Sequence, residues 1–454
     1  MLVGAATLIA YRAPAARPNV VLVTMDTLRA DRLGCYGGPL ATPHVDQVAR
    51  EGVRFDQAHC PMPMTRPSHA SLFTSRAPRE HGVLHNASAL PADLPTLAEQ
   101  LRGAGYQTAA FVSAWLLGPE SGQTRGFDVV DVPSRHDFSA GQATVDRARA
   151  WLQTTGQAPF FLWVHLFDAH IPYQPAAAFA PQSPPDVAAR LPAASWETLT
   201  AQARANGGDL PAALFERAKA LYDGEVREVD AAVGQLVDAL RARGVLDRTV
   251  VVLTADHGEC FEHGIFFQHV TCLYEAAARV PLVVRYPPAL AAGGQRRDAV
   301  ELIDVAPTVL ALAGAPRPVG FRGRSLFDAD GAAPPVSVVQ HPVPLDEVAA
   351  RRQSVTGDIG SVAGMPARRW GSGRGQFAVI EGPWKAILSP HGAELYDLAA
   401  DPDETDDRAA TRPEAVAAAR ERLAEWQRTH PERAPRGAEV GPAARERLRA
   451  LGYQ

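Results

Sequence analysis

The chain has 454 residues, of which 46% are hydrophobic and 21% are charged, and its formal net charge is -5. This length exceeds what one small core needs, so we expect a large domain and a smaller one. The slightly negative charge excludes a broadly basic surface, and no nucleic-acid partner is expected.

The first 18 residues are expected to be a leader or the remnant of a membrane anchor. Their apolar run is shorter than the roughly 20 residues that cross a bilayer. It resembles the hydrophobic part of a signal peptide, with Ala13-Pro14-Ala15 as a small-residue processing site, although basic residues do not precede it. We therefore expect a periplasmic, extracellular or membrane-tethered protein that contacts a membrane only through this segment. A disordered leader is the alternative.

Short runs rich in valine, leucine and phenylalanine alternate with helical patterns up to about residue 335. Buried strands are predicted for NVVLVTM, TAAFV, FFLWVHL, TVVVLTA and PLVVR, at 19–25, 108–112, 160–166, 249–255 and 281–285. Helices are predicted at 92–103, 142–154 and about 211–243. For residues 19–335 this alternation predicts an α/β fold, with a mainly parallel central sheet sandwiched by helices. The proline- and alanine-rich stretch at 172–196 is predicted to be an excursion over one face, as a lid would be.

The pattern changes after residue 335. QFAVIEGPWKAIL and AELYDL read as short strands joined by turns, which predicts a small antiparallel subdomain over 336–411. Residues 412–454 are rich in alanine, arginine and glutamate and predict a helical tail with a solvated face.

The four cysteines, Cys35, Cys60, Cys260 and Cys272, show no spacing typical of a zinc site. Whether they are free or paired stays open at this stage. Cysteine usage therefore does not fix the redox compartment.

Polar residues follow three of the predicted strands. Asp26 follows the first, Asp168 and His170 follow FFLWVHL, and Asp256 and His257 follow TVVVLTA. Each alone is explained by a helix cap or a loop hydrogen bond. Because function in an open α/β sheet gathers beyond the carboxyl ends of its strands, three such strand ends predict one site. Carboxylates with an imidazole suit a divalent cation.

The segment MPMTRPSHASLFTS, at 62–75, places Thr65 between Pro63 and Pro67 at the start of a predicted helix. One interpretation is an N-cap. The other is a nucleophile whose target anion lies at the positive end of the helix dipole. A cation beside the hydroxyl favours the second, because it lowers the hydroxyl pKa and neutralises charge on an oxyanion ester. His170 and His269 are then candidates to bind the ester oxygens or to protonate the leaving group.

Taken in order, several segments resemble the sulfatase family of the alkaline phosphatase superfamily, over about 19–411. They are VVLVTMDTLRADRLGCYG, TPHVDQVAREGVRFDQAHC, PMTRPSHASLFTS, FFLWVHLFDAHIPY, DGEVREVDAAVGQLVDAL, VVLTADHGE, LYEAAARVPLVVR and AELYDLAADPDETDD. The resemblance implies an ester hydrolase with one divalent metal ion, Ca, Mg, Mn or Zn. It also implies that Asp26, Asp256 and His257 hold this ion together with Thr65.

The chain departs from the sulfatase pattern at positions that carry the usual chemistry. Thr65 stands where sulfatases have the Cys or Ser that is oxidised to formylglycine, and threonine cannot give that aldehyde because its β-carbon carries a methyl group. His69 replaces the arginine of the motif, and Thr27 replaces a second aspartate. Ser113 and Trp115 stand where many sulfatases have a catalytic lysine and histidine.

These departures favour a metal-dependent hydrolase, or a transferase, that acts on phosphate esters rather than sulfate esters through Thr65 as nucleophile. His170 and His269 orient the substrate or assist the leaving group. His69 contacts the substrate, supports Thr65 or lies on the helix surface. The expected substrate is an ester of a small molecule, a glycan or a lipid headgroup.

Three alternatives stay open. The first is a sulfuric ester hydrolase that works without formylglycine. The second has two metal ions, with Asp168, His170 and His269 as the additional ligands. The third is a relative that binds an anion or a glycan without turnover.

Overall fold

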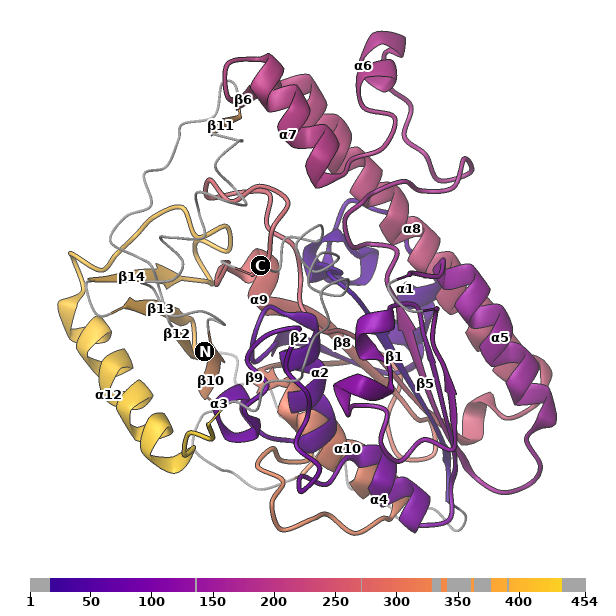
Figure 1. The fold of residues 1–454 in the computed structure, drawn as a ribbon. Coiled ribbons are helices and arrows are strands. Elements are labelled where there is room, and N and C mark those ends of the chain that lie inside the picture. Colours follow the sequence, from indigo (N-terminus) through magenta and orange to yellow (C-terminus); the bar gives the residue numbers. More distant parts are fainter. Residues whose placement is uncertain are drawn as a thin grey trace.

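The computed structural model describes most of the chain, including almost all of the predicted catalytic domain (Figure 1). The described residues are 17–134, 137–270, 272–328, 336–340, 361–362, 377–389 and 392–434. Residues 1–16 of the expected leader and 435–454 of the expected tail lie outside this set. Within the described residues, the structure contains no helix with both the length and the apolar character of a membrane span.

The core of the fold is a sheet with the strand order β4-β3-β5-β1-β7-β8-β2-β9. Its strands are β1 (Asn19–Met25), β2 (Val53–His59), β3 (Gln107–Val112), β4 (Val129–Asp131), β5 (Phe160–Leu166), β7 (Thr249–Ala255), β8 (Arg279–Arg285) and β9 (Gly294–Glu301). All neighbours pair in parallel except β8, which is antiparallel to both β7 and β2. The expected α/β fold with a mainly parallel sheet is confirmed.

Helices cover both faces of this sheet. The helices described in this part of the chain are α1 (Pro43–Glu51), α2 (Thr65–Thr74), α3 (Pro78–His81), α4 (Leu97–Gly103), α5 (Gly141–Thr154), α6 (Pro185–Arg190), α7 (Trp196–Ala205), α8 (Ala212–Ala242), α9 (Glu275–Ala278) and α10 (Val305–Ala313). Helices α1, α5 and α8 pack together on one face, and α2, α4 and α10 pack on the other (Figure 1). Because both faces are covered, every residue of β1, β5 and β7 is buried.

A second, antiparallel sheet follows, as expected for the C-terminal part of the chain. It has the order β10-β12-β13-β14, with β10 (Val336–Gln340), β12 (Phe377–Glu381), β13 (Trp384–Ser389) and β14 (Gly392–Asp397). Helix α12 (Pro413–Thr429) packs against it. A short two-stranded sheet pairs β6 (Asp209–Leu210) with β11 (Ser361–Val362).

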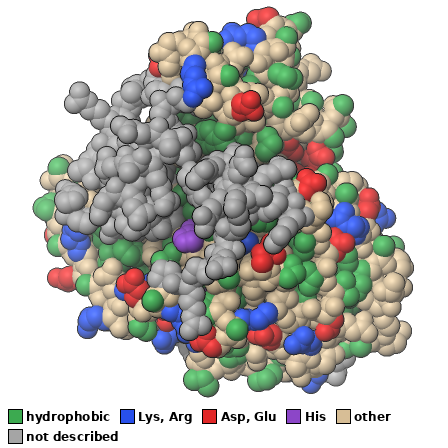
Figure 2. Space-filling model, viewed as in Figure 1, with side chains coloured by type: hydrophobic (Ala, Val, Ile, Leu, Met, Phe, Trp, Pro, Cys, Tyr) green, Lys and Arg blue, Asp and Glu red, His purple; other side chains and the backbone are tan. Residues whose placement is uncertain are grey.

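The register of the central strands positions the site. Met25 at the end of β1 pairs with Leu166 of β5 on one side and with Ala255 of β7 on the other. The residues that follow these three strands therefore leave the sheet side by side. On the visible surface, acidic and basic side chains are interspersed (Figure 2).

Candidate active site

Three residues that follow β1 and β7 meet in a buried cluster. Asp26, Asp256 and His257 each offer a ligand atom, and these atoms lie within 4.8 Å of one another. All three side chains are fully buried. The structure therefore brings together the three residues that the sequence predicts as metal ligands.

The polar atoms of this cluster fit a divalent cation. Among the described residues, Asp26 Oδ1, Asp256 Oδ2 and His257 Nε2 have no hydrogen-bond partner. His257 Nε2 lies 3.8 Å from Asp26 Oδ1 and 3.4 Å from Asp256 Oδ2. His257 Nδ1 donates to the Gly258 carbonyl at 3.0 Å, so its Nε2 lone pair points to the two carboxylates. A buried carboxylate oxygen without a hydrogen-bond partner costs free energy of folding. A cation held between these three atoms offsets that cost.

The electrostatics of the cluster follow from its burial. Burial raises the pKa of Asp26 to about 7 and that of Asp256 to about 7, and it lowers the pKa of His257 to about 4. The imidazole is therefore neutral near pH 7, which is the form that binds metals. The two carboxylates ionise reluctantly side by side, and a bound cation favours their charged forms.

Thr65 is the first residue of α2 and lies beside the cluster of Asp26, Asp256 and His257. The N-cap is Met64, whose side chain makes no capping hydrogen bond, so the interpretation of Thr65 as an N-cap is wrong. The Thr65 side chain instead lies close to the Asp26 carboxylate, whose pKa burial raises and the Thr65 hydroxyl lowers. At the next position the Arg66 backbone N–H donates to Asn86 Oδ1 at 2.8 Å, and Pro67 has no N–H to offer.

His69 is buried behind Thr65, so the expectation of a helix-surface histidine is wrong. Its Nδ1 donates to the Thr65 carbonyl at 2.9 Å, and its Nε2 accepts from the Thr24 hydroxyl at 3.0 Å. Thr24 in turn accepts from the Trp163 indole N–H at 2.9 Å. With both ring nitrogens bonded to protein groups, His69 is placed to support Thr65. Its predicted role in substrate binding stays a prediction.

His170 and His269 complete the group. The His269 ring stacks on the His257 ring with centroids 4.3 Å apart, and the His170 ring lies 5.4 Å from that of His269. His170 Nδ1 donates to the Ile171 carbonyl at 2.6 Å, and its ring stacks on Phe167. His269 therefore lies against His257, and His170 lies beside His269.

Asp168 does not join this group. Its Oδ1 accepts from the Gly141 backbone N–H at 2.8 Å, at the start of α5. Asp168 therefore serves as a helix cap, the simpler explanation of an aspartate after a strand. Its other oxygen, Oδ2, is buried and has no hydrogen-bond partner among the described residues, and the two-metal alternative stays a prediction.

Two further side chains lie next to these residues, of which His165 was not predicted and Glu259 was expected only as a residue that could support the metal ligands. His165, inside β5, places Nε2 3.2 Å from Asp26 Oδ2. Glu259 places Oε1 3.2 Å from His269 Nδ1. A histidine within the apolar run FFLWVHL was a signal for the first, because an unpaired polar side chain is rare in a buried strand.

The departures from the sulfatase pattern have structural explanations. The Thr27 hydroxyl lies 2.6 Å from the Ala169 carbonyl, to which it donates, and so it does not turn toward the cluster. Ser113 shares a hydrogen bond with Thr144 at 2.9 Å. Trp115 is buried in the core.

Several known proteins are similar to this chain in sequence. The Sulfatase family model matches residues 18–315. Human arylsulfatase A is 30% identical over 429 residues, with 85% of this chain and 77% of that protein covered. An N-acetylglucosamine-6-O-sulfatase of Bacteroides thetaiotaomicron is 28% identical over 394 residues, with 68% and 70% covered.

Solved structures share the fold. A protein in complex with its substrate D-glucosamine-2-N,6-O-disulfate has a TM-score of 0.72, 24% identity, and coverage of 91% of this chain and 98% of that one. The phosphonate monoester hydrolase of Agrobacterium radiobacter has a TM-score of 0.68, 20% identity, and coverage of 92% and 96%.

Proposed function

Because this chain belongs to the sulfatase family of ester hydrolases, we propose that Thr65 is its nucleophile and that it prefers phosphate esters to sulfate esters. Asp26, Asp256 and His257 hold one divalent cation beside the Thr65 hydroxyl. The natural substrate is an ester of a small molecule, a glycan or a lipid headgroup. If an acceptor other than water takes the group bound to Thr65, the same chemistry makes the protein a transferase.

One observation carries this proposal, the closeness of the Thr65 hydroxyl to the Asp26 carboxylate, whose pKa burial raises and this hydroxyl lowers. It places the hydroxyl oxygen at the edge of a cluster whose three ligand atoms face one another. A cation bound there lowers the pKa of a neighbouring hydroxyl and neutralises charge on the ester.

The preference for phosphorus follows from the chemistry of threonine. Formylglycine can expel sulfate by elimination, whereas an ordinary threonine ester has to be cleared by a second attack at sulfur or phosphorus. Phosphorus accepts such in-line attack readily when positive charge stabilises the transition state. In the first step Thr65 Oγ1 bonds to phosphorus while the bond to the leaving oxygen breaks, and that oxygen takes up a proton. Water then attacks the threonine phosphate and releases phosphate and the free hydroxyl.

His170 and His269 are the proposed partners of the ester oxygens. The His269 ring stacks on His257, and the His170 ring lies beside that of His269. They orient the ester or deliver a proton to the leaving oxygen. Residues 172–220 and the C-terminal sheet are proposed to set substrate specificity.

The test compares the metal-reconstituted enzyme with Thr65→Ala and Thr65→Ser on four p-nitrophenyl substrates: the phosphate, the phosphate diester, the phenylphosphonate and the sulfate. We expect the wild type to turn over a phosphorus ester, and Thr65→Ala to lose roughly 10³-fold or more of kcat. Thr65→Ser keeps a hydroxyl and retains most of the activity. Reconstitution with Ca²⁺, Mg²⁺, Mn²⁺ and Zn²⁺ in turn identifies the metal.

The second candidate function is sulfuric ester hydrolysis with Thr65 attacking directly. It is favoured by the 30% identity to human arylsulfatase A. A clear preference for p-nitrophenyl sulfate would establish it and contradict the phosphate proposal. Metal binding without turnover of any of the four substrates would favour an anion- or glycan-binding relative.

We further propose that the protein is exported or membrane-tethered through residues 1–18. The disulfide between Cys260 and Cys272 supports this, because such bonds persist in oxidising compartments. We also propose the division into a catalytic domain at 19–335, a subdomain at 336–411 and a tail at 412–454.

A further inference from the structure

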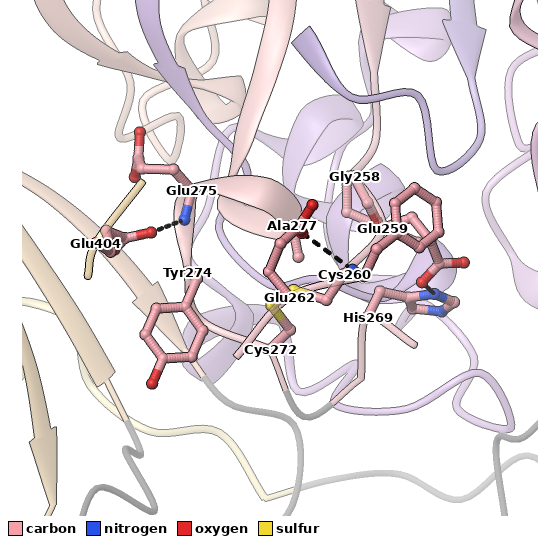
Figure 3. Close-up of a disulfide and its surroundings, with 12 residues drawn as sticks. Gly258, Glu259, Cys260, Glu262, His269, Cys272, Tyr274, Glu275, Ala277 and Glu404 are labelled. Atoms are coloured by element: carbon pink, nitrogen blue, oxygen red, sulfur yellow. Dashed lines mark hydrogen bonds and ion pairs between the residues drawn. A yellow bond between two sulfur atoms is a disulfide. The ribbon is translucent and has the colours of Figure 1, made fainter. Parts of the chain in front are cut away.

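The loop after β7 contains a buried carboxylate that holds the ring of His269. Glu259 Oε1 lies 3.2 Å from His269 Nδ1, and Oε2 accepts from the Tyr173 hydroxyl at 3.1 Å. The Glu259 backbone carbonyl accepts from the Arg29 guanidinium at 3.1 Å. Glu259 and Tyr173 are both fully buried. Figure 3 shows the carboxylate and the imidazole side by side.

A covalent cross-link joins the two short segments that carry Glu259 and His269. Cys260 directly follows Glu259, Cys272 lies three residues after His269, and the two cysteines form a disulfide with their Cα atoms 6.5 Å apart (Figure 3). Backbone hydrogen bonds run alongside it, from Cys260 N to Gln268 O at 2.9 Å and from Cys272 N to His269 O at 2.8 Å. The segment between the cysteines is therefore a closed loop with the Glu259–His269 contact at its base.

We propose that Glu259 is the positioning residue of His269 and that the Cys260–Cys272 disulfide holds these two residues in register. Both carboxylate oxygens of Glu259 have hydrogen-bond partners, so it is not a further member of the Asp26, Asp256 and His257 ligand set. The expected effect on catalysis rests on the proposed function, in which His269 contacts the ester. The orientation of the His269 ring does not depend on that function.

The physical reason lies in the geometry of imidazole. When Nδ1–H donates to a fixed carboxylate, Nε2 is held on the opposite side of the ring. The stacking on His257 restrains the plane of the ring but leaves its tautomer free, and the carboxylate selects the tautomer. Cross-linking the ends of a short loop restricts the conformations in which Glu259 and His269 separate.

The first test reads the tautomer directly and needs no turnover. In protein labelled with ¹⁵N-histidine, His269→Gln identifies the His269 signals among those of the 14 histidines. We expect His269 Nδ1 to carry the proton in the wild type and in Glu259→Gln, which keeps an acceptor oxygen. In Glu259→Leu this preference should be lost, while the Mn²⁺ affinity stays within twofold of wild type. A proton on Nε2 alone in the wild type, or an unchanged tautomer in Glu259→Leu, would overturn the proposal.

The second test removes the cross-link. The double variant Cys260→Ser/Cys272→Ser should lose the fixed tautomer, and kcat for the best p-nitrophenyl ester should fall roughly tenfold or more with metal content unchanged. Dithiothreitol should affect the wild type in the same way and leave the double variant unchanged. Cys35→Ser, which removes an unpaired cysteine, is the matched control. A double variant with wild-type tautomer and wild-type kcat would show that the disulfide has no positioning role.

Failure of the proposed function and failure of this inference give different experimental results. If the wild type turns over none of the four esters, the proposed function fails, and the tautomer of His269 still decides the inference. If Cys260→Ser/Cys272→Ser does not fold, the comparison of Glu259→Leu with Glu259→Gln decides the role of Glu259, and reduction of the folded wild type decides that of the disulfide.

Discussion

At the scale of single residues, the proposed metal ligands contact further side chains that hold them in place. His165 Nε2 lies 3.2 Å from Asp26 Oδ2, while Asp26 Oδ1 faces the cluster. We predict that His165→Leu weakens Mn²⁺ binding roughly 10- to 100-fold, because Asp26 loses the N–H that fixes its orientation. Isothermal titration measures the affinity directly.

The matched control for this prediction is Phe161→Leu. Phe161 lies in the same strand and is equally buried, but it contacts no ligand. It should lose stability and keep its Mn²⁺ affinity. An affinity that falls equally in both variants would assign His165 to packing alone.

Single residues also show how far the sequence can predict the site. Asp26, Asp256 and His257 were predicted because each follows a recognisable strand, and the register of parallel strands then brings them together. The role of His69 could not be decided, since a histidine near the start of a helix can face solvent or core. Which of these it faces depends on Thr24, whose position comes from the whole sheet.

At the scale of elements, the loop after β7 is held by a close backbone contact. Gly258 N donates to Ala277 O at 2.8 Å, and a Cβ on Gly258 would lie 2.1 Å from the Ala276 carbonyl oxygen. Gly258→Ala therefore has to move the backbone next to His257. We predict a loss of about 1–3 kcal/mol in the free energy of unfolding and a large loss of metal affinity.

Gly103→Ala provides the comparison, because a Cβ there meets no atom within 4 Å. It should be neutral or slightly stabilising, since alanine favours a helix more than glycine does. Both variants are measured by urea unfolding and by metal titration. Retention of full metal affinity in Gly258→Ala would contradict the close-contact argument.

The strands that carry the site were easier to predict than the strands at the edge. The sequence analysis predicted β1, β5 and β7 with the bounds that the structure has, because burial on both faces requires continuous apolar runs. It missed β9, the outermost strand, whose sequence GQRRDAVE is largely exposed and has no apolar run. The antiparallel direction of β8 could not be predicted either, because an apolar run indicates a buried strand but not the direction in which the strand runs.

At the scale of the whole molecule, a buried charge cluster joins the two sheets. Lys385 of β13 is fully buried, with Nζ 2.8 Å from Glu275 Oε1 and 2.9 Å from Glu404 Oε1. Glu275 belongs to α9, next to the loop that carries His269. Lys385→Met leaves two buried carboxylates without their cation. We predict a loss of about 3–5 kcal/mol in the free energy of unfolding, measured by urea denaturation.

Lys219 is the other lysine of the chain and serves as the control. It is partly exposed, and its Nζ lies 3.7 Å from Glu216 Oε2. Exposed pairs contribute about 0–1 kcal/mol, so Lys219→Met should change stability by less than about 1 kcal/mol. Equal losses in the two variants would show that the Lys385 cluster adds nothing beyond a surface pair.

Metal binding and pH should be linked through the buried carboxylates. Burial raises the pKa of Asp26 and Asp256 to about 7 from an ordinary value of 3.8. In metal-free protein their contribution to stability is therefore fully present below about pH 4 and is lost as pH rises through 7. Buried His257, with a pKa lowered to about 4, contributes in the opposite direction, since its stabilisation is lost as pH falls from about 6.5 to 4.

The difference in melting temperature between Mn²⁺-saturated and metal-free protein separates the effect of the proposed ligands from that of the other buried titratable groups, because those other groups are the same in both samples. A cation binds the ionised carboxylates, which at pH 5 must first release protons and at pH 8 are already charged and mutually repelling. We predict that the gain in melting temperature on adding Mn²⁺ increases from pH 5 to pH 8. In Asp26→Asn/Asp256→Asn the gain should vanish at every pH. A gain that is equal at pH 5 and pH 8 would mean that protons and metal do not compete for these carboxylates, and the metal would then have to bind elsewhere.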